Sequence, residues 1–207
     1  MKGGIVYADK ISTVSKTYAN EIQTPRYSYG MDGVLKSRAA DLSGIINGID
    51  YSGNNPLSDS RIYAPYSADN LENKRVNKRK LQEELGLPQG DMSIIVIISR
   101  MSDQKGFDLI SFALEELMHR DIQMVVLGTG EGRYENMFTH CAGRFRDKLS
   151  ANIIIDTTLA QRIYAASDIF LMPSLFEPCG LGQMIAMRYG SVPVVRRTGG
   201  LNDTVHD

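Results

Sequence analysis

The sequence predicts an α/β fold built on a Rossmann-like parallel sheet, and two patterns carry that prediction. From about residue 92 on, short apolar runs alternate along the chain with segments of helical spacing. Apolar runs without internal alternation are typical of strands that are buried on both faces. Their regular alternation with helices favours parallel strands joined by right-handed crossovers. A composition of 43% hydrophobic and 23% charged residues indicates a globular chain.

The predicted strands and helices of this region follow one another in strict order. The strands are residues 93–99, 122–128, 152–156, 168–174 and 191–197. Helical spacing follows the first strand at Ile110, Ala113, Leu114 and Leu117, and the second at Tyr134, Met137, Phe138 and Cys141. Shorter helices are predicted around 159–166 and over 180–189. In an open sheet of this kind, ligands bind at the carboxyl ends of the strands.

The first 90 residues are less regular. The predicted elements are a strand, a helix, a second strand and a second helix, at 10–15, 16–22, 42–50 and 78–87. Residues 51–73 are rich in Ser, Asn, Asp and Pro, which is typical of a loop or linker. We therefore divide the chain into a first segment at 1–55, a linker at 56–77 and a second domain at 78–207.

Composition excludes several classes of function. A formal net charge of −1 gives no electrostatic basis for binding nucleic acid or an anionic membrane. No apolar run approaches the roughly 20 residues that span a bilayer. Two cysteines, Cys141 and Cys179, form no disulfide framework and suit a reducing compartment, so we expect a cytoplasmic protein. The three histidines lack metal-ligand spacing, so we expect no metal site.

Two cations lie in the loop that follows the first strand of the sheet. In SRMSDQKGFD, Arg100 and Lys105 precede a predicted helix. Cations beside a helix N-terminus make an anion site, because the free backbone N–H groups add to their field. Two solvated surface residues are the more common explanation of such a pair. The sequence alone leaves both explanations open.

Glycines mark two further loops after strands. LGTGEGRYE contains Gly128 and Gly130, and RRTGGLNDT contains Thr198, Gly199 and Gly200. Glycines allow a ligand to approach the backbone closely, but a tight turn between strand and helix explains them equally well.

The stretch SLFEPCGLG places a carboxylate, Glu177, at the corner where a helix should begin. Gly180 and Gly182 follow it and remove side chains from the turn. A carboxylate repels phosphate, but it accepts hydrogen bonds from sugar hydroxyls and stabilises a developing positive charge. An acid that only complements the helix dipole is the alternative, on equal terms. Together with the cations and glycine loops, this pattern suggests a phosphorylated sugar or nucleotide sugar as ligand.

Taken together, the motifs resemble those of bacterial glycogen synthases and plant starch synthases. These are retaining glucosyltransferases with two Rossmann-like domains, the GT-B architecture. The matching phrases are KGGIVYADKISTVSKTYANEIQTP, GIINGIDY, SRMSDQKGFDLI, VVLGTGEGRYE, RIYAASDIFLMPSLFEPCGLGQMIAMRYG and RRTGGLNDTV. They occur in the order of the family and cover nearly the whole chain. The resemblance implies transfer of glucose from ADP-glucose to the non-reducing end of an α-1,4-glucan, with retention and without a metal or other cofactor.

The resemblance also implies roles for individual residues. Glu177 would hold glucose hydroxyls and support an oxocarbenium-like transition state, and Arg100 and Lys105 would neutralise the donor diphosphate. The implied donor-binding residues are Gly128, Gly130, Cys179, Gly180, Leu181, Thr198, Gly199 and Gly200. In three places the chain departs from the family pattern, and one of them is the linker after GIINGIDY, which usually carries a tryptophan that this chain lacks. Ile154 and Ile155 stand where an aromatic residue usually lies against adenine, which leaves ADP and UDP open, and Ile185 replaces a second glutamate.

By comparison with this family, we interpret the chain as a fragment. Residues 1–55 would be the tail of the N-terminal domain and 78–207 most of the C-terminal, nucleotide-sugar-binding domain. We expect such a piece to be inactive alone and to self-associate through its exposed domain interface. The alternative function is a non-catalytic module that binds nucleotide or glucan.

Overall fold

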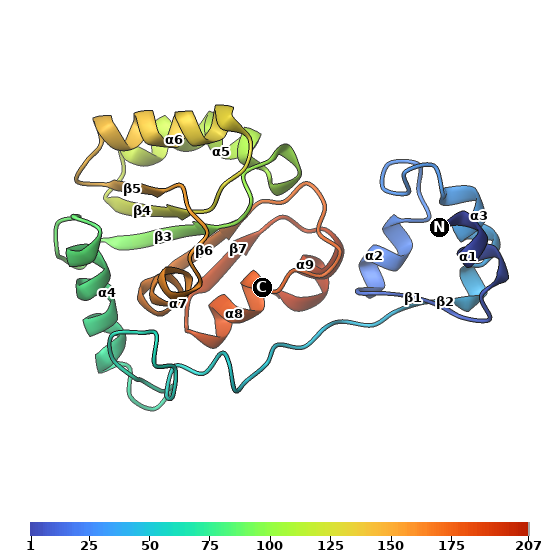
Figure 1. Ribbon diagram of the computed structural model, residues 1–207, viewed down its shortest axis with the longest axis horizontal. Coiled ribbons are helices and arrows are strands. Elements are labelled where there is room, and N and C mark those ends of the chain that lie inside the picture. Colours follow the sequence, from blue (N-terminus) through green and yellow to red (C-terminus); the bar gives the residue numbers. More distant parts are fainter. Residues whose placement is uncertain (207) are drawn as a thin grey trace. The chain divides into compact units, whose positions relative to one another are not determined.

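The computed structural model describes residues 1–206, which form two compact units (Figure 1). Unit 1 consists of Met1–Gly48, Ser174–Leu181 and the segment from Val195 on. Unit 2 consists of Ile49–Pro173 and Gly182–Val194. The chain therefore contributes two short late segments to the unit that its first 48 residues form. The predicted assignment of 1–55, 56–77 and 78–207 to the domains of a longer enzyme stays a prediction.

Unit 2 is built on a five-stranded sheet in the order β5-β4-β3-β6-β7. The strands are β3 (Ser93–Ile98), β4 (Ile122–Leu127), β5 (Leu149–Asn152), β6 (Ile169–Met172) and β7 (Val192–Val195). β3 pairs in parallel with both β4 and β6, and β4 pairs in parallel with β5. The predicted parallel sheet is confirmed.

Helices cover both faces of this sheet, as Figure 1 shows for α5 and α6 on one side and α4, α7 and α8 on the other. The helices are α4 (Glu72–Glu84), α5 (Phe107–Met118), α6 (Gly132–Arg144), α7 (Thr157–Ala166) and α8 (Gly182–Arg188). A short 3-10 helix, η2 (Asp103–Lys105), precedes α5. Because the strands are buried on both faces, their apolar runs do not alternate with polar residues.

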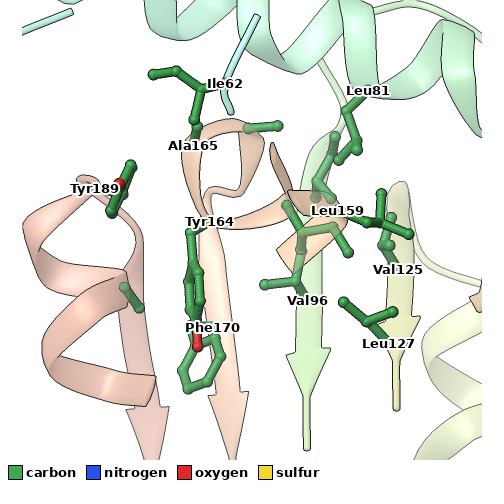
Figure 2. Close-up of a cluster of buried hydrophobic side chains, with 14 of the residues drawn as sticks. Ile62, Leu81, Val96, Val125, Leu127, Leu159, Tyr164, Ala165, Phe170 and Tyr189 are labelled. Atoms are coloured by element: carbon green, nitrogen blue, oxygen red, sulfur yellow. The ribbon is translucent and has the colours of Figure 1, made fainter. Parts of the chain in front are cut away.

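Each face of the sheet has its own apolar core. In the first, Val96 and Val125 pack with residues of α4, α7 and α8, including Leu81, Leu159 and Tyr164 (Figure 2). In the second, residues that alternate with them along the strands pack against α5 and α6. These are Ile97, Met124 and Val126 from the strands and Phe107, Leu114 and Phe138 from the helices.

Two predicted elements lie elsewhere than expected. The predicted strand at 152–156 is wrong, because β5 ends at Asn152 and the apolar residues after it form a loop. β5 is an edge strand, so it needs fewer apolar residues than the central strands. The helix predicted at 78–87 begins earlier, at Glu72, where the side-chain oxygen of Asn70 accepts a hydrogen bond from the Glu72 amide at 3.1 Å.

The polar segment before α4 packs on the rest of unit 2. Tyr66 is buried, and its hydroxyl donates to the backbone oxygens of Tyr189 at 2.8 Å and Ala165 at 3.3 Å. The Lys74 ammonium donates to the same two oxygens, at 2.9 and 3.1 Å. Burial lowers the pKa of Lys74 to about 8. These contacts join the carboxyl ends of α7 and α8 to the segment before and at the start of α4.

Unit 1 has a parallel pair of short strands, β1 (Ile11–Thr13) and β2 (Leu42–Gly44). Its helices are α1 (Lys2–Tyr7), α2 (Lys16–Glu21), α3 (Asp32–Ser37), the 3-10 turn η1 (Ala39–Asp41) and α9 (Gly199–Thr204). Both strands and α2 were predicted, although β2 ends at Gly44 rather than near residue 50. A Cβ on Gly44 would lie 2.1 Å from the backbone oxygen of Ser15, so the end of β2 requires glycine.

Candidate functional site

The loops after β3 and β4 lie against each other at the carboxyl edge of the unit 2 sheet. A Cβ on Gly128 would lie 1.9 Å from the Ser99 oxygen, and one on Gly130 would lie 2.1 Å from the Met101 oxygen. The Met101 amide donates to the Thr129 oxygen at 2.9 Å. The two predicted glycines therefore have a structural reason: they allow the two loops to touch through their backbones. A role toward a ligand stays a prediction.

A cavity of about 350 Å³ opens at this edge of unit 2. Its lining combines the ends of β3 and β4 with the loop after β5 and the start of α7, and includes Arg100, Gly128, Thr129, Ile154, Ile155 and Asp156. Ile155 is 86% exposed, which is unusual for an isoleucine. Ile154 and Ile155, which the sequence analysis placed in a strand, thus line a cavity at the carboxyl edge of the sheet.

The start of α7 is fixed at the edge of this cavity by Asp156. Its side chain accepts hydrogen bonds from the amides of Thr158 at 2.8 Å and Leu159 at 2.9 Å. An aspartate at this position satisfies amides that would otherwise lack partners. The helix that forms this side of the cavity wall is therefore capped at its first turn.

The two predicted cations lie on one loop, but they are held in different ways. Arg100 is exposed, lines the cavity, and donates to the side-chain oxygen of Gln104 at 3.3 Å. Lys105 ends η2 and is partly buried. Neither Lys105 nor Gly130 is among the residues that line the cavity in the part of the chain that the structure describes.

The loop that carries both cations is anchored to α6. The Tyr134 hydroxyl donates a short hydrogen bond to Asp103, and Arg133 donates to the same carboxylate at 2.6 Å. These two contacts, with the hydrogen bond from Tyr134 the larger, hold the pKa of Asp103 below its usual value. Gly106, at φ 78°, then turns the chain into α5, and a Cβ there would lie 2.3 Å from the Pro173 oxygen.

In unit 1, the loop Ser174–Leu181 meets the turn that opens α9. Glu177 is only 7% exposed, and its side chain accepts a hydrogen bond from Ser174 Oγ at 3.3 Å. The Gly200 amide donates to the Glu177 backbone oxygen at 3.0 Å. Cβ atoms on Gly199 and Gly200 would lie 1.9 Å from the Glu177 oxygen and 2.2 Å from the Cys179 oxygen. The two glycines let one loop lie directly on the other.

The glycines after Glu177 have separate reasons. Gly180 adopts a left-handed φ of 75°, which other residues rarely adopt. A Cβ on Gly182 would lie 2.9 Å from the ring of Phe170, within unit 2. Leu181, by contrast, is about half exposed. Of the predicted residues, unit 1 thus brings together Glu177, Cys179, Gly180, Leu181, Thr198, Gly199 and Gly200.

Two carboxylates that sequence reasoning missed hold this arrangement in place. Glu21, the last residue of α2, accepts hydrogen bonds from Thr198 Oγ1 at 2.9 Å and from the Gly199 amide at 3.0 Å. Asp203, near the end of α9, accepts from Ser15 Oγ at 2.8 Å and from the Thr17 amide at 2.9 Å. Each helix therefore has its N-terminal groups satisfied by an acid from the end of the other.

The environment of Asp203 keeps it ionised. Burial alone would raise its pKa, but hydrogen bonds from Thr17, Ser15 and Asn202 outweigh burial and lower the pKa below its usual value. Glu21 uses one oxygen for α9, while its Oε2 is buried and has no hydrogen-bond partner among the described residues. No sequence spacing could have shown these pairs, because about 180 residues separate their members.

Comparisons with known proteins identify the family. Residues 93–207 match the family model described as glycosyl transferases group 1, and residues 1–37 match the starch synthase catalytic domain. The first match covers more than half of the chain. The chain belongs to the group 1 glycosyl transferases. The residues of this group 1 glycosyl transferase that match the family model include all five strands of the unit 2 sheet.

Similar proteins support a narrower resemblance. The glycogen synthase of Clostridium novyi (strain NT) is 60% identical over 206 residues, which are 99% of this chain and 43% of that protein. The catalytic domain of starch synthase IV from Arabidopsis thaliana, bound to ADP and acarbose, is 39% identical with a TM-score of 0.94, over 100% of this chain and 43% of that one. The resemblance to glycogen and starch synthases is confirmed. The chain spans less than half the length of these relatives.

The fold class is confirmed by more distant neighbours. Anabaena HepE, in complex with UDP and glucose, shares the fold at a TM-score of 0.65 and 18% identity, over 99% of this chain and 48% of that one. The parallel α/β sheet is that of GT-B glycosyltransferases. Within residues 1–206, no helix combines the length and the apolar character needed to cross a membrane.

Proposed function

We propose that this protein is part of a glycogen or starch synthase that transfers glucose from ADP-glucose to the non-reducing end of an α-1,4-glucan, with retention. The observation that carries the proposal is the 60% identity to a glycogen synthase over 99% of the chain. The matched stretch extends over both units, so it spans the positions of all eleven predicted site residues. It does not favour the alternative of a non-catalytic binding module.

In this proposal, unit 2 binds the nucleotide end of the donor. The apolar cavity beside Ile154 and Ile155 accepts the base, and Gly128 lets the ligand approach the backbone. Arg100 lines the same cavity, and Lys105 lies on the same anchored loop. Their charges stabilise the negative charge that develops on the diphosphate as the bond to the sugar breaks.

Unit 1 binds the glucose end of the donor. Glu177 is nearly buried and held at its backbone by Gly200, so its carboxylate is preorganised. When the bond from the anomeric carbon to the diphosphate breaks, the electron pair leaves with ADP and positive charge develops on the sugar. Glu177 stabilises that charge while the 4-hydroxyl oxygen of the acceptor forms the new bond on the same face and passes its proton to an oxygen of the departing diphosphate.

The proposed reaction takes place in the cytoplasm and uses no metal, no other cofactor, no nucleic acid and no membrane. Without a metal, cationic side chains must stabilise the negative charge of the diphosphate, and we assign this role to Arg100 and Lys105. Cys141 and Cys179 are both buried and neither forms a disulfide, which fits a reducing compartment.

Calorimetry with ADP and UDP tests the role of the cations. Each charge-assisted hydrogen bond contributes about 1.5–3 kcal/mol. Lys105→Ala should therefore weaken ADP binding about ten-fold or more, at about 1.4 kcal/mol per decade. Lys80→Ala is the control, because Lys80 pairs with Glu83 on α4 at 2.9 Å. Unchanged ADP binding in Lys105→Ala would refute the assigned role, and tighter binding of UDP than of ADP would refute the donor.

A rate assay in the protein of native length tests Glu177. Glu177→Gln keeps the shape of the side chain and removes its charge, so incorporation of labelled glucose should fall at least a hundred-fold, the size of a lost electrostatic contact at a transition state, about 2.7 kcal/mol. ADP binding should hold or tighten, because a repelling charge is removed. Glu72→Gln, at the exposed start of α4, should change neither quantity. A normal rate in Glu177→Gln would contradict the mechanism.

We also propose that copies of this chain self-associate through an apolar face of unit 2. A second cavity of about 350 Å³ is lined by apolar residues of α5, β6 and β7, among them Leu109, Leu117, Leu171 and Val194. Leu109 and Val194 are about half exposed, and exposed apolar patches of this kind drive association. Sedimentation should show association that Leu109→Ser weakens. A clean monomer at high concentration would contradict it.

A further inference from the structure

A loop of unit 1 holds one tyrosine in a backbone conformation that tyrosine rarely adopts. Tyr29 has φ 51°, in the left-handed region, and is the one residue other than glycine with a positive φ among residues 1–206. Bulky side chains disfavour this region, and residues that occupy it concentrate at functional sites. Glycine adopts this conformation without strain, as Gly30 does at the next position. A tyrosine at position 29 therefore needs a reason other than the formation of the turn.

The loop around Tyr29 is well ordered by its own hydrogen bonds. Ser28 is buried, donates to the Asp32 carboxylate at 3.0 Å and accepts from the Gly30 amide at 3.2 Å. The Met31 amide donates to the Ser28 oxygen at 3.0 Å. Tyr29 is therefore presented by a rigid turn, while its own side chain is 81% exposed.

Three aromatic rings meet at this turn, and we call Tyr27, Tyr29 and Phe176 the aromatic platform. The rings of Tyr27 and Tyr29 each lie 6.3 Å from that of Phe176, in edge-to-face arrangements. Arg26 lies over the Tyr27 ring at 5.4 Å. Phe176 is the residue directly before Glu177. The platform thus joins an exposed ring to the loop that carries the buried carboxylate.

We propose that the aromatic platform binds a glucosyl unit of the acceptor glucan, with Tyr29 as its main contact. This inference rests on the proposed function, which brings an α-1,4-glucan to the Glu177 loop. The face of an aromatic ring is negative, and the C–H face of a sugar ring packs against it. The tyrosine hydroxyl can also bond to sugar hydroxyls. Tyr29 suits such a contact because its ring is exposed and the turn holds it in position. A binding role would also explain why tyrosine occupies a strained backbone position.

The ligand that fits is a polymer rather than a single sugar. Neighbouring residues such as Phe176 and Glu177 need not face the same way, so the platform and the carboxylate need not touch one sugar. A glucan chain has further units beyond its reacting end, and a ring that holds one of them adds affinity and positions the acceptor. We therefore expect the platform to affect acceptor binding and to leave nucleotide binding alone.

Titration of the chain with maltoheptaose, followed by calorimetry, tests the platform. Tyr29→Ala should weaken maltoheptaose binding about five-fold, the size of one aromatic contact. Tyr29→Phe keeps the ring and should bind within about two-fold of the original chain. Tyr29→Gly also removes the ring but relieves the backbone, so it should lose affinity while its melting temperature rises. That combination separates a binding role from a structural one.

Tyr7→Ala is the matched control, because Tyr7 is 88% exposed in the same unit and should not affect binding. ADP titration of every variant separates the two hypotheses. Two results would overturn the platform and leave the proposed function standing. In the first, the original chain binds ADP normally but does not bind maltoheptaose. In the second, it binds both ligands, and Tyr29→Ala leaves maltoheptaose binding unchanged. If the original chain binds neither ADP nor maltoheptaose, the proposed function and the platform are both overturned. Dissociation of an oligomer by Tyr29→Ala would show that a second copy occupies the ring, and would also overturn the platform.

Discussion

The two units of this protein differ in the interactions that stabilise each of them internally. Unit 2 buries large apolar side chains on both faces of its sheet, in two separate cores. In unit 1 most of the buried residues are small or polar, such as Ser15, Ala19, Ser174, Glu177 and Thr198, and the large apolar side chains of Leu35 and Leu201 are buried beside them. Apolar burial has no preferred direction, whereas hydrogen bonds require exact placement of donor and acceptor.

The difference suits what each unit is proposed to do. An apolar core gives unit 2 a stable support for its loops and cavity. In unit 1, the carboxylates of Glu21 and Asp203 hold α2 and α9 together, and the glycines of the α9 turn let its backbone lie directly against that of Glu177. The comparison predicts that unit 2 tolerates changes of polarity at its surface, while unit 1 is sensitive to single polar atoms and to single methyl groups.

The largest expected effect is a truncation in the core of unit 2. Phe138 is fully buried, and its ring lies edge-on at 5.8 Å from that of Phe107. Phe138→Ala should lower the free energy of unfolding by about 3–5 kcal/mol, because it removes apolar burial and leaves a cavity. Urea denaturation measures this value. Phe112→Ala is the control, since Phe112 is 92% exposed on the neighbouring α5 and should cost little. Equal effects of the two changes would contradict the assigned core.

The second effect concerns the polar contacts of unit 1. Asp203→Ala removes the acceptor for Ser15 Oγ and for the Thr17 amide. Leaving these donors unpaired should cost about 2–3 kcal/mol. Hydrogen exchange at the amides of α2 should accelerate, while exchange in the sheet of unit 2 should not. Asp9→Ala, an exposed aspartate of the same unit, is the control. Unchanged exchange in α2 would show that apolar contacts hold unit 1 after all.

The third effect tests a single methyl group. A Cβ on Gly200 would meet backbone atoms of Cys179 at 2.2–2.6 Å, which no side-chain rotation can relieve. Gly200→Ala should therefore destabilise unit 1 by about 1–3 kcal/mol and displace the backbone of Glu177. Gly132→Ala, at the start of α6, meets nothing within 4 Å and should be nearly neutral. Thermal unfolding compares the two, and a neutral Gly200→Ala would refute the close approach of these loops.

The smallest effect is a pH dependence of unit 1. The folded-state pKa of Asp203 lies below its unfolded value, so its contribution to stability is fully present above about pH 4. It is lost as the pH falls through the folded pKa, when the carboxylate takes up a proton. Hydrogen exchange of α2 measured on an acid series should show this loss in the original chain. The series should be flatter in Asp203→Asn, and an identical slope would assign the acid sensitivity to another group.

The sequence by itself determined most of unit 2. The apolar runs of β3, β4, β6 and β7 and the spacing of α5 and α6 are local patterns, because a strand buried on both faces and a helix covering a sheet each have a period that the chain records directly. The same logic failed at residues 153–155, because an apolar run does not say whether it lies inside a sheet or lines a cavity at its edge.

Only the tertiary structure decided how unit 1 is built. The sequence singled out Glu177 and the pair Gly199–Gly200, yet it did not show that their backbones touch, or that Glu21 and Asp203 join two helices from opposite ends of the chain. A hydrogen bond between residues about 180 positions apart leaves no periodic trace, since any Glu or Asp in a short helix looks the same whether it faces solvent or another helix. Such contacts depend on where the fold returns each segment, and that is a property of the packed chain rather than of any stretch within it.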